Sequence, residues 1–167
     1  FINCTFEDDV LAYIPDEDSG YTFTANFESR AIFKNCTFEG KAMFKYSEFD
    51  RDASFEGTKF NSYSTFKYAK FSRDISFRNT NFEEEATFKY AKFSRNVSFA
   101  DAVFKETATF KYAKFHDGVS FNSTRFDQDL NLKYTKVSGE FDIKGMKVAF
   151  GIDTKYTKIN GKKFSFY

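Results

Sequence analysis

Near its middle the chain reads Ser64-Thr65-Phe66-Lys67-Tyr68-Ala69-Lys70-Phe71. Nearly the same residues return at 86–93 and again at 108–115, each time 22 residues further along the chain. Self-similarity at a fixed period of this size is typical of repeat proteins, in which each unit buries its apolar face against the next unit. We therefore interpret the whole chain as copies of one structural unit.

Phenylalanine follows the same period over a longer part of the chain, because successive residues lie alternately five and six positions apart. This series comprises Phe33, Phe38, Phe44, Phe49, Phe55, Phe60, Phe66, Phe71, Phe77, Phe82, Phe88, Phe93, Phe99, Phe104, Phe110, Phe115, Phe121 and Phe126. Neither a helix nor a flat strand keeps side chains at this spacing on one face. A chain that turns a corner after every five or six residues points each of them inward. Four such sides close one coil of 22 residues.

Segments such as Ala69-Lys70-Phe71-Ser72-Arg73 and Ala91-Lys92-Phe93-Ser94-Arg95 resemble the units of the pentapeptide-repeat family. In that family a small residue and a central Leu or Phe both point inward. The small position is occupied here by Ala53, Thr58, Ser64, Ala69, Thr80, Ala86, Ala91, Ala102, Ala108, Ala113 and Thr124. The resemblance covers most of residues 21–160 and implies an all-β fold, a right-handed quadrilateral β-helix. Its coils, at about 22 residues, are longer than the family's usual twenty.

The motif Asn-Cys-Thr-Phe occurs at Asn3-Cys4-Thr5-Phe6 and again at Asn35-Cys36-Thr37-Phe38. Together with the Phe-rich coils it is similar to the luminal pentapeptide domain of synaptic vesicle glycoprotein 2, which implies a surface that recognises another protein. Both cysteines fall on the small inward position of one side. We expect them one coil apart, either as stacked thiols or as a disulfide.

Residues 1–167 are predicted to form a single solenoid with two irregular parts. A loop insertion at about 7–20 separates Phe6 from Thr22, the next residue that fits the pattern, and it contains the only proline, Pro15. The C-terminal segment at about 160–167 leaves the pattern and is rich in aromatic residues. It either covers the last coil or forms an interface, and the family resemblance favours a homodimer through this end.

Residues suited to catalysis are scarce. His116 is the only histidine, it follows an inward Phe, and its side chain should face solvent with no partner to orient it as a general base. Phosphate-binding, nucleophile and metal-binding motifs are absent from the sequence, and the acidic residues 16–18 lack the other ligands of a calcium loop. We therefore predict no enzyme activity, no cofactor and no metal site.

Lysine and tyrosine recur on the outside of every coil and give the best candidate for a binding surface. The tyrosines of one corner form a predicted tyrosine ladder: Tyr46, Tyr68, Tyr90, Tyr112, Tyr134 and Tyr156. Each follows a member of the first lysine file: Lys45, Lys67, Lys89, Lys111, Lys133 and Lys155. The adjacent side carries the second lysine file: Lys70, Lys92, Lys114, Lys136 and Lys158. Acidic residues are expected elsewhere, on the insertion and at the corner with Glu83, Glu84, Glu85, Glu106, Asp127 and Asp129.

Two classes of function fit these observations. The rod is an interaction module that binds an anionic polymer or another protein through the lysine and tyrosine ridge, or it is a structural spacer of a larger protein whose lysines only keep it soluble. The family resemblance adds a third function, inhibition of a topoisomerase by mimicry of DNA, but lysine files occupy the length that an acidic face would need. The net charge of +1 gives no specific signal for a nucleic-acid partner, and no apolar run is long enough to span a membrane.

Overall fold

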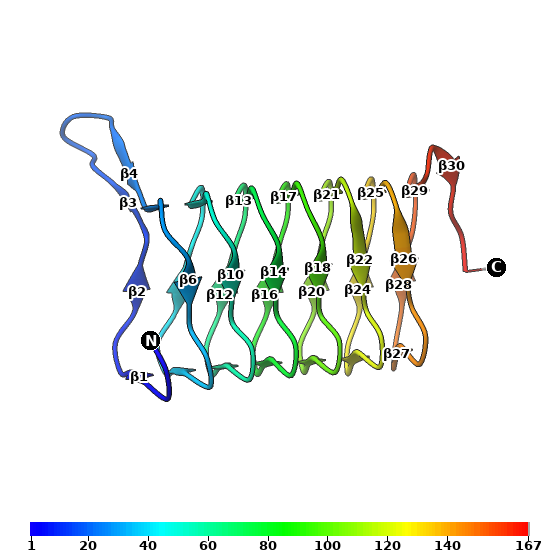
Figure 1. Ribbon diagram of the computed structural model, residues 1–167, viewed down its shortest axis with the longest axis horizontal. Coiled ribbons are helices and arrows are strands. Elements are labelled where there is room, and N and C mark those ends of the chain that lie inside the picture. The colour runs from blue at the N-terminus through cyan, green and yellow to red at the C-terminus, as the bar shows by residue number, and fades with distance from the viewer. Residues whose placement is uncertain (167) are drawn as a thin grey trace.

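The computed structural model describes residues 1–166, which form a rod of stacked four-sided coils (Figure 1). Each full coil places one short strand on each of four sheets. We number the sheets in the order in which the coil that begins at Ala31 contributes to them. The described residues contain strands and turns but no helix. The predicted all-β solenoid is confirmed, and its 22-residue period appears directly in the pairing of Phe71 with Phe93. The right-handed sense of the coil stays a prediction.

The strands of the four sheets have the following bounds. Sheet 1 contains β6 (Ala31–Ile32), β10 (Ala53–Ser54), β14 (Ile75–Ser76), β18 (Val97–Ser98), β22 (Gly118–Ser120) and β26 (Glu140–Asp142). Sheet 2 contains β1 (Thr5–Phe6), β7 (Thr37–Phe38), β11 (Lys59–Phe60), β15 (Asn81–Phe82), β19 (Val103–Phe104), β23 (Arg125–Phe126) and β27 (Lys147–Val148). Sheet 3 contains β2 (Val10–Leu11), β8 (Ala42–Met43), β12 (Ser64–Thr65), β16 (Ala86–Thr87), β20 (Ala108–Thr109), β24 (Leu130–Asn131) and β28 (Ile152–Asp153). Sheet 4 contains β5 (Asn26–Phe27), β9 (Glu48–Phe49), β13 (Lys70–Phe71), β17 (Lys92–Phe93), β21 (Lys114–Phe115), β25 (Lys136–Val137), β29 (Lys158–Ile159) and β30 (Lys162–Lys163).

Strands of successive coils pair in parallel without any shift, so equivalent residues lie directly above one another. Lys70 pairs with Lys92, Lys92 with Lys114, and Lys114 with Lys136. A backbone separation of about 4.8 Å then becomes the spacing of every column of side chains. This register is what turns a sequence repeat into continuous files on the surface and continuous stacks in the core.

The core consists of four columns of phenylalanine rings, one behind each sheet. Rings within a column are nearly parallel, as for Phe66 and Phe88, whose centroids are 5.0 Å apart with an interplanar angle of 3°. Rings of neighbouring columns meet edge to face, as for Phe77 and Phe88 at 5.3 Å and 83°. Both arrangements suit the charge distribution of an aromatic ring. They explain why phenylalanine dominates the core, since equal rings stack without gaps along a column.

The small inward positions fill the space between the columns. Several threonines there are buried and bond back to the previous coil: Thr80 Oγ1 donates to the carbonyl oxygen of Phe55 at 2.9 Å, and Thr157 Oγ1 to that of Leu132 at 2.6 Å. Cys36 is buried, Cys4 is half-buried, and both are free thiols rather than a disulfide. Of the two arrangements expected for the cysteines, the structure therefore has the reduced one.

The insertion begins later than predicted. Val10 and Leu11 form β2 and pair with β8, so Ala12 occupies the position that Phe44 has in the next coil, where Thr22 was expected. Phe27 lies fifteen positions after Ala12, whereas Phe49 lies five positions after Phe44. The expected loop at about 7–20 is instead an antiparallel hairpin of β3 (Tyr13–Pro15) and β4 (Thr22–Thr24), which projects from one end of the rod (Figure 1). The Phe pattern did not reveal this side of the coil, because Ala12 stands where the next coils have a phenylalanine.

The C-terminal segment returns over the last coil. Strand β30 pairs antiparallel with β29, the Phe164 amide donates to the Thr157 carbonyl oxygen at 3.0 Å, and the Phe164 ring meets Phe141 edge to face at 5.2 Å. Of the two expected arrangements this contact is the cap; a homodimer through the same end stays a prediction. Tyr167, part of the segment predicted at about 160–167, lies outside the described residues.

Candidate functional site

The tyrosine ladder forms a continuous stack at the corner between sheets 3 and 4. Adjacent rings are 4.7–4.9 Å apart, and their planes deviate from parallel by at most 17°. This spacing equals the strand separation because each tyrosine stands 22 residues from the next in an unshifted register. The structure therefore brings together all six tyrosines that the sequence placed on one corner.

The backbone of this corner is strained. All six tyrosines have φ between 59° and 63°, in the left-handed region. For a residue with a Cβ atom this conformation costs roughly 1 kcal/mol. The corner between sheets 1 and 2 needs a similar conformation, and there the chain mostly uses residues that adopt it more easily: Asn35, Gly57, Asn79, Asp101, Ser123 and Gly145. Tyrosine is thus retained at the other corner despite its backbone conformation, which points to its ring as the useful part.

The first lysine file lies against the ladder. The ammonium nitrogen of each of its lysines is 5.0–5.6 Å from the centroid of the tyrosine ring that follows it. These are cation–π distances, and such contacts hold the lysine side chains against the tyrosine ladder. The file therefore gives the ladder a positive flank.

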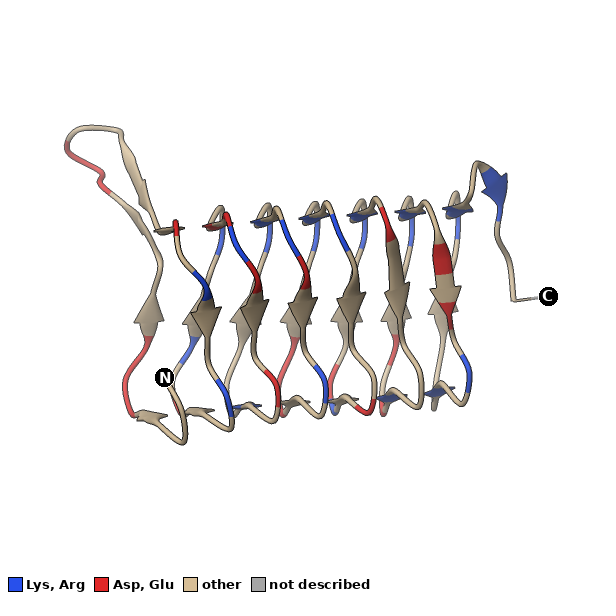
Figure 2. Ribbon diagram, viewed as in Figure 1, with Lys and Arg blue, Asp and Glu red and all other residues tan. Residues whose placement is uncertain are grey.

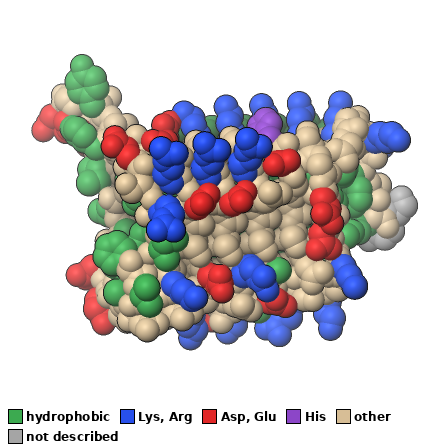
Figure 3. Space-filling view, in the orientation of Figure 1, with side chains coloured by type: hydrophobic (Ala, Val, Ile, Leu, Met, Phe, Trp, Pro, Cys, Tyr) green, Lys and Arg blue, Asp and Glu red, His purple; other side chains and the backbone are tan. Residues whose placement is uncertain are grey.

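The second lysine file lies on sheet 4, on the other side of the ladder. Figures 2 and 3 show basic residues following one edge of the rod. Lys70 forms an ion pair with Glu48 of the preceding coil. Among the described residues no ion-pair partner accompanies Lys92, Lys114, Lys136 or Lys158. The four lysines beyond Lys70 are consequently a row of uncompensated positive charges.

A groove lies between the C-terminal part of the ladder and the second lysine file. It has a volume of about 460 Å³ and is lined by Tyr90, Tyr112, Lys114, Tyr134, Lys136, Tyr156 and Lys158. A separate groove of about 410 Å³ lies near the hairpin and includes Glu48 and Lys70, whose charges offset each other. The C-terminal groove therefore has tyrosine rings on one wall and lysines without an ion-pair partner on the other.

The hydroxyl group of Tyr112, which lines the groove, is a weaker acid than that of a free tyrosine. Desolvation raises its pKa above the ordinary value, and the neighbouring Tyr134 and Tyr90 raise it further. The phenol stays protonated well above neutral pH. Tyr112 therefore presents a neutral hydroxyl group to a ligand in the groove.

Tyr13 is a member of this site that the sequence analysis missed. It comes from the hairpin, and its ring lies 5.7 Å from that of Tyr46, with the Lys45 ammonium group 4.5 Å from its centroid. It covers the first tyrosine of the ladder at the N-terminal end. The available signal was the spacing from Phe6, which makes Ala12 the next inward residue and starts the insertion at this corner.

Acidic residues are less segregated than their sequence positions suggested. Glu83 is bound by Lys105 at 2.7 Å, and Asp127 by Arg125 at 2.9 Å, both on sheet 2. Arg78 and Asp101 approach to 3.9 Å at the neighbouring corner. Two acids of this corner are thus paired with cations, whereas among the described residues no ion pair engages Glu84, Glu85, Glu106 or Asp129.

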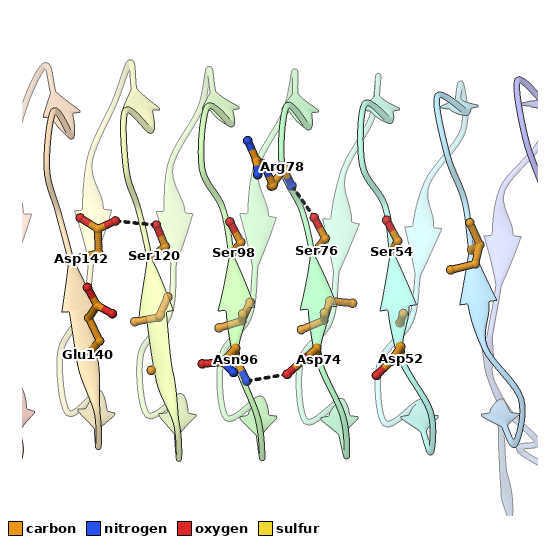
Figure 4. A pocket seen from close by; sticks show the side chains of 16 residues that line it. Asp52, Ser54, Asp74, Ser76, Arg78, Asn96, Ser98, Ser120, Glu140 and Asp142 are labelled. Carbon is orange, nitrogen blue, oxygen red and sulfur yellow. Dashed lines mark hydrogen bonds between the residues drawn. The ribbon is translucent and has the colours of Figure 1, made fainter.

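Sheet 1 carries a shallow groove of about 530 Å³ (Figure 4). The sequence analysis assigned nothing to it. Its four serines serve the corners of the coil: the Ser76 hydroxyl oxygen accepts the backbone N–H of Arg78 at 3.3 Å, and the same bond recurs at Ser54, Ser98 and Ser120. A structural role thus accounts for this regular row of hydroxyl groups.

His116 is exposed, as expected. Within residues 1–166 no three histidine, cysteine or acidic side chains are grouped to hold a metal ion. The same residues include no helix of the length and apolar character needed to cross a membrane.

Comparison with known proteins gives one match. A family model described as "Pentapeptide repeats (9 copies)" matches residues 23–69, 44–92, 56–102, 66–113 and 88–136. Comparisons with curated proteins and with solved structures give no match. The similarity to synaptic vesicle glycoprotein 2 expected from the Asn-Cys-Thr-Phe motifs is therefore without support.

Proposed function

The chain belongs to the pentapeptide-repeat family, and we propose that this rod is a non-enzymatic interaction module whose groove holds an extended anionic polymer. The groove between the tyrosine ladder and the second lysine file is the proposed binding site. A polymer would lie parallel to the rod axis, with its charges against the lysines and its apolar faces against the rings.

The observation that carries this proposal is the row of unpaired lysines beside the strained tyrosine corner. Like charges on adjacent strands repel one another, and the neighbouring coils offer Lys92, Lys114 and Lys136 no acid. An anionic ligand would remove this repulsion and gain Coulomb attraction along the whole file. The stacked rings add a flat surface on which sugar rings or an extended chain can lie.

Partner shape follows from the repeat. The lysines recur at about the strand separation of 4.8 Å, so a linear polymer with closely spaced charges matches them better than a compact protein. We propose a polysaccharide carrying sulfate or carboxylate groups, or an acidic polypeptide segment. Mimicry of DNA is disfavoured because lysine files occupy the length of the rod, and because Lys105 and Arg125 pair with two of the acids on the far side.

Charge removal on the two sides of the rod tests the proposal. The triple variant Lys92→Gln, Lys114→Gln and Lys136→Gln should weaken binding to heparin and to polyglutamate by at least about tenfold, which is about 1.4 kcal/mol. The residual binding should depend less steeply on salt, since screening acts on the lost charges.

The matched control removes three lysines from sheet 2 or its edge: Lys59→Gln, Lys105→Gln and Lys147→Gln. Net charge changes equally, so equal loss of binding in both triple variants would show non-specific attraction and contradict the groove. If the wild-type chain binds no polyanion, and the groove variant is slightly more stable, the rod is a spacer whose lysines only solvate it.

A further inference from the structure

The two ends of the tyrosine ladder are built differently. At the N-terminal end the chain itself covers the first rung, because the hairpin places Tyr13 against Tyr46. At the C-terminal end Tyr156 stacks on Tyr134 with one face, at 4.7 Å, and remains 53 % exposed. Among the described residues no ring stacks on its other face.

A cavity of about 510 Å³ lies between the last coil and the C-terminal segment. It is lined by Thr154, Lys155, Tyr156, Thr157, Lys158, Lys163, Phe164 and Ser165. The segment is held in place by the pairing of β30 with β29 and by the bond from the Phe164 amide to Thr157. The C-terminal segment therefore forms a second wall of the cavity, opposite the last coil, which the open groove along the rod lacks.

Among the described residues, three lysines and no acidic residue line this cavity. Lys158 and Lys163 stand directly opposite each other in the antiparallel pair, a placement in which like charges destabilise a sheet. The Lys155 ammonium nitrogen is 5.2 Å from the centroid of the Tyr156 ring. Positive charge is thus concentrated around an aromatic face, and an anion between the lysines would relieve their repulsion.

We propose that this cavity binds a small planar aromatic anion, an aromatic ring that carries a phosphate or sulfate group. The ring stacks on the free face of Tyr156 as one more rung of the ladder. The anionic group lies between Lys158 and Lys163, within reach of Lys155. Stacking and charge together select this class, since a saturated ring lacks the first interaction and a neutral aromatic lacks the second.

Four probes separate the two contributions, with binding to the full chain measured by calorimetry. Phenyl phosphate should bind about fivefold more tightly than cyclohexyl phosphate, which has the same charge and no aromatic face. Inorganic phosphate should bind no better than cyclohexyl phosphate, and phenol should not bind measurably. Equal affinities for phenyl phosphate, cyclohexyl phosphate and inorganic phosphate would overturn the proposal, because they would show attraction by charge alone.

Two variants locate the site. Tyr156→Asn keeps a residue that tolerates the left-handed backbone and should reduce phenyl phosphate to the affinity of cyclohexyl phosphate. Lys163→Gln should weaken both phosphates by about tenfold. Its control is Lys162→Gln, since Lys162 stands opposite Ile159 on the same strand and does not line the cavity. Equal effects of the two lysine variants would place the ligand elsewhere.

The groove variant with Lys92, Lys114 and Lys136 changed to Gln distinguishes this site from the proposed polymer site. It should keep phenyl phosphate binding within about twofold, because none of these residues lines the cavity. Lys163→Gln should leave heparin binding nearly unchanged. Loss of phenyl phosphate binding in the groove variant would mean that the probe occupies the groove and would refute a separate site.

Discussion

The interior coils and the two end coils share one backbone but bury their cores to different extents. Phe82, in the interior, has no exposed surface and stacks between Phe60 and Phe104 at 5.0 and 4.5 Å. Phe6, in the same column, has one stacked neighbour in it, Phe38, at 4.7 Å, and is only half-buried. A ring in this fold is therefore stabilised mainly by the coils above and below it.

The last coils meet the same situation with different residues. Ile143 and Val148 replace rings in two of the columns, while Phe141 takes the small position that Val119 has one coil earlier. Large and small residues have exchanged places on sheet 1, and Phe141 contacts both Phe121 and Phe164 edge to face. The comparison shows that the apolar contacts of a residue depend on its place along the rod. The contribution of a hydrogen bond between two coils should not depend on that place.

The largest expected effect compares two rings of one column. Phe82→Ala should lower the free energy of unfolding by about 3–5 kcal/mol, because it leaves a cavity between two stacked rings. Phe6→Ala should cost only about 1–2 kcal/mol, since less apolar surface is buried there. Urea denaturation followed by circular dichroism measures both values. Equal costs at the two sites would contradict stabilisation by neighbouring coils.

The second prediction concerns buried hydroxyl groups and expects no difference between interior and end. Thr80→Ala and Thr157→Ala each remove one bond to the carbonyl oxygen of a previous coil and should each cost about 1–2 kcal/mol. Ala102, one coil beyond Thr80, shows that alanine fits this column. A cost at Thr157 of less than half that at Thr80 would show that the last coil is too loose to use the bond.

The third prediction concerns a stabilising change. The Ser64 hydroxyl is buried, and no hydrogen-bond partner for it exists among the described residues. Ala42 and Ala86 occupy the same column on either side. Ser64→Ala should therefore raise the free energy of unfolding by about 1 kcal/mol. A loss of stability in the same denaturation experiment would indicate that the hydroxyl group is satisfied after all.

The smallest effect distinguishes Asp142 from the serines of the interior coils. The Lys144 backbone N–H at 3.0 Å, followed by the Ser120 hydroxyl, lowers the pKa of Asp142 below its ordinary value. A depressed pKa stabilises the fold above the unfolded-state pKa of about 3.9, and that contribution is lost as pH falls through the folded-state value. Asp142→Ser should therefore lose slightly less stability than the wild type between pH 7 and about pH 3. An identical loss in both proteins would remove any role for this carboxylate.

The fold was predictable because a single residue type, phenylalanine, recurs with the period of the coil. Phe residues five and six apart fix the corners, and the pairing of Phe71 with Phe93 follows from the repeat alone. The position of the insertion was not predictable in the same way. Ala12 and Val10 occupy inward positions without the ring that marks them elsewhere, so the pattern gave no sign that β2 continues the coil.

For the candidate site, columns were predictable and contacts from outside the repeat were not. The tyrosine ladder and both lysine files follow directly from the 22-residue period. Tyr13 and Lys163 reach the two ends of the ladder from a hairpin and a returning strand, whose courses depend on tertiary pairing. The positive φ of the tyrosines was also hidden, since tyrosine is an unusual choice for that conformation.

The unshifted register makes the length of this rod a separate variable from its cross-section. Removing or adding one whole unit of 22 residues joins strands that already have identical neighbours, as at Lys70, Lys92 and Lys114. Unequal recombination between near-identical gene segments would thus shorten or extend the molecule in steps of about 4.8 Å while leaving every surface column intact. Such a molecule can be matched to the length of its partner by copy number alone, without any change in the chemistry of its surface.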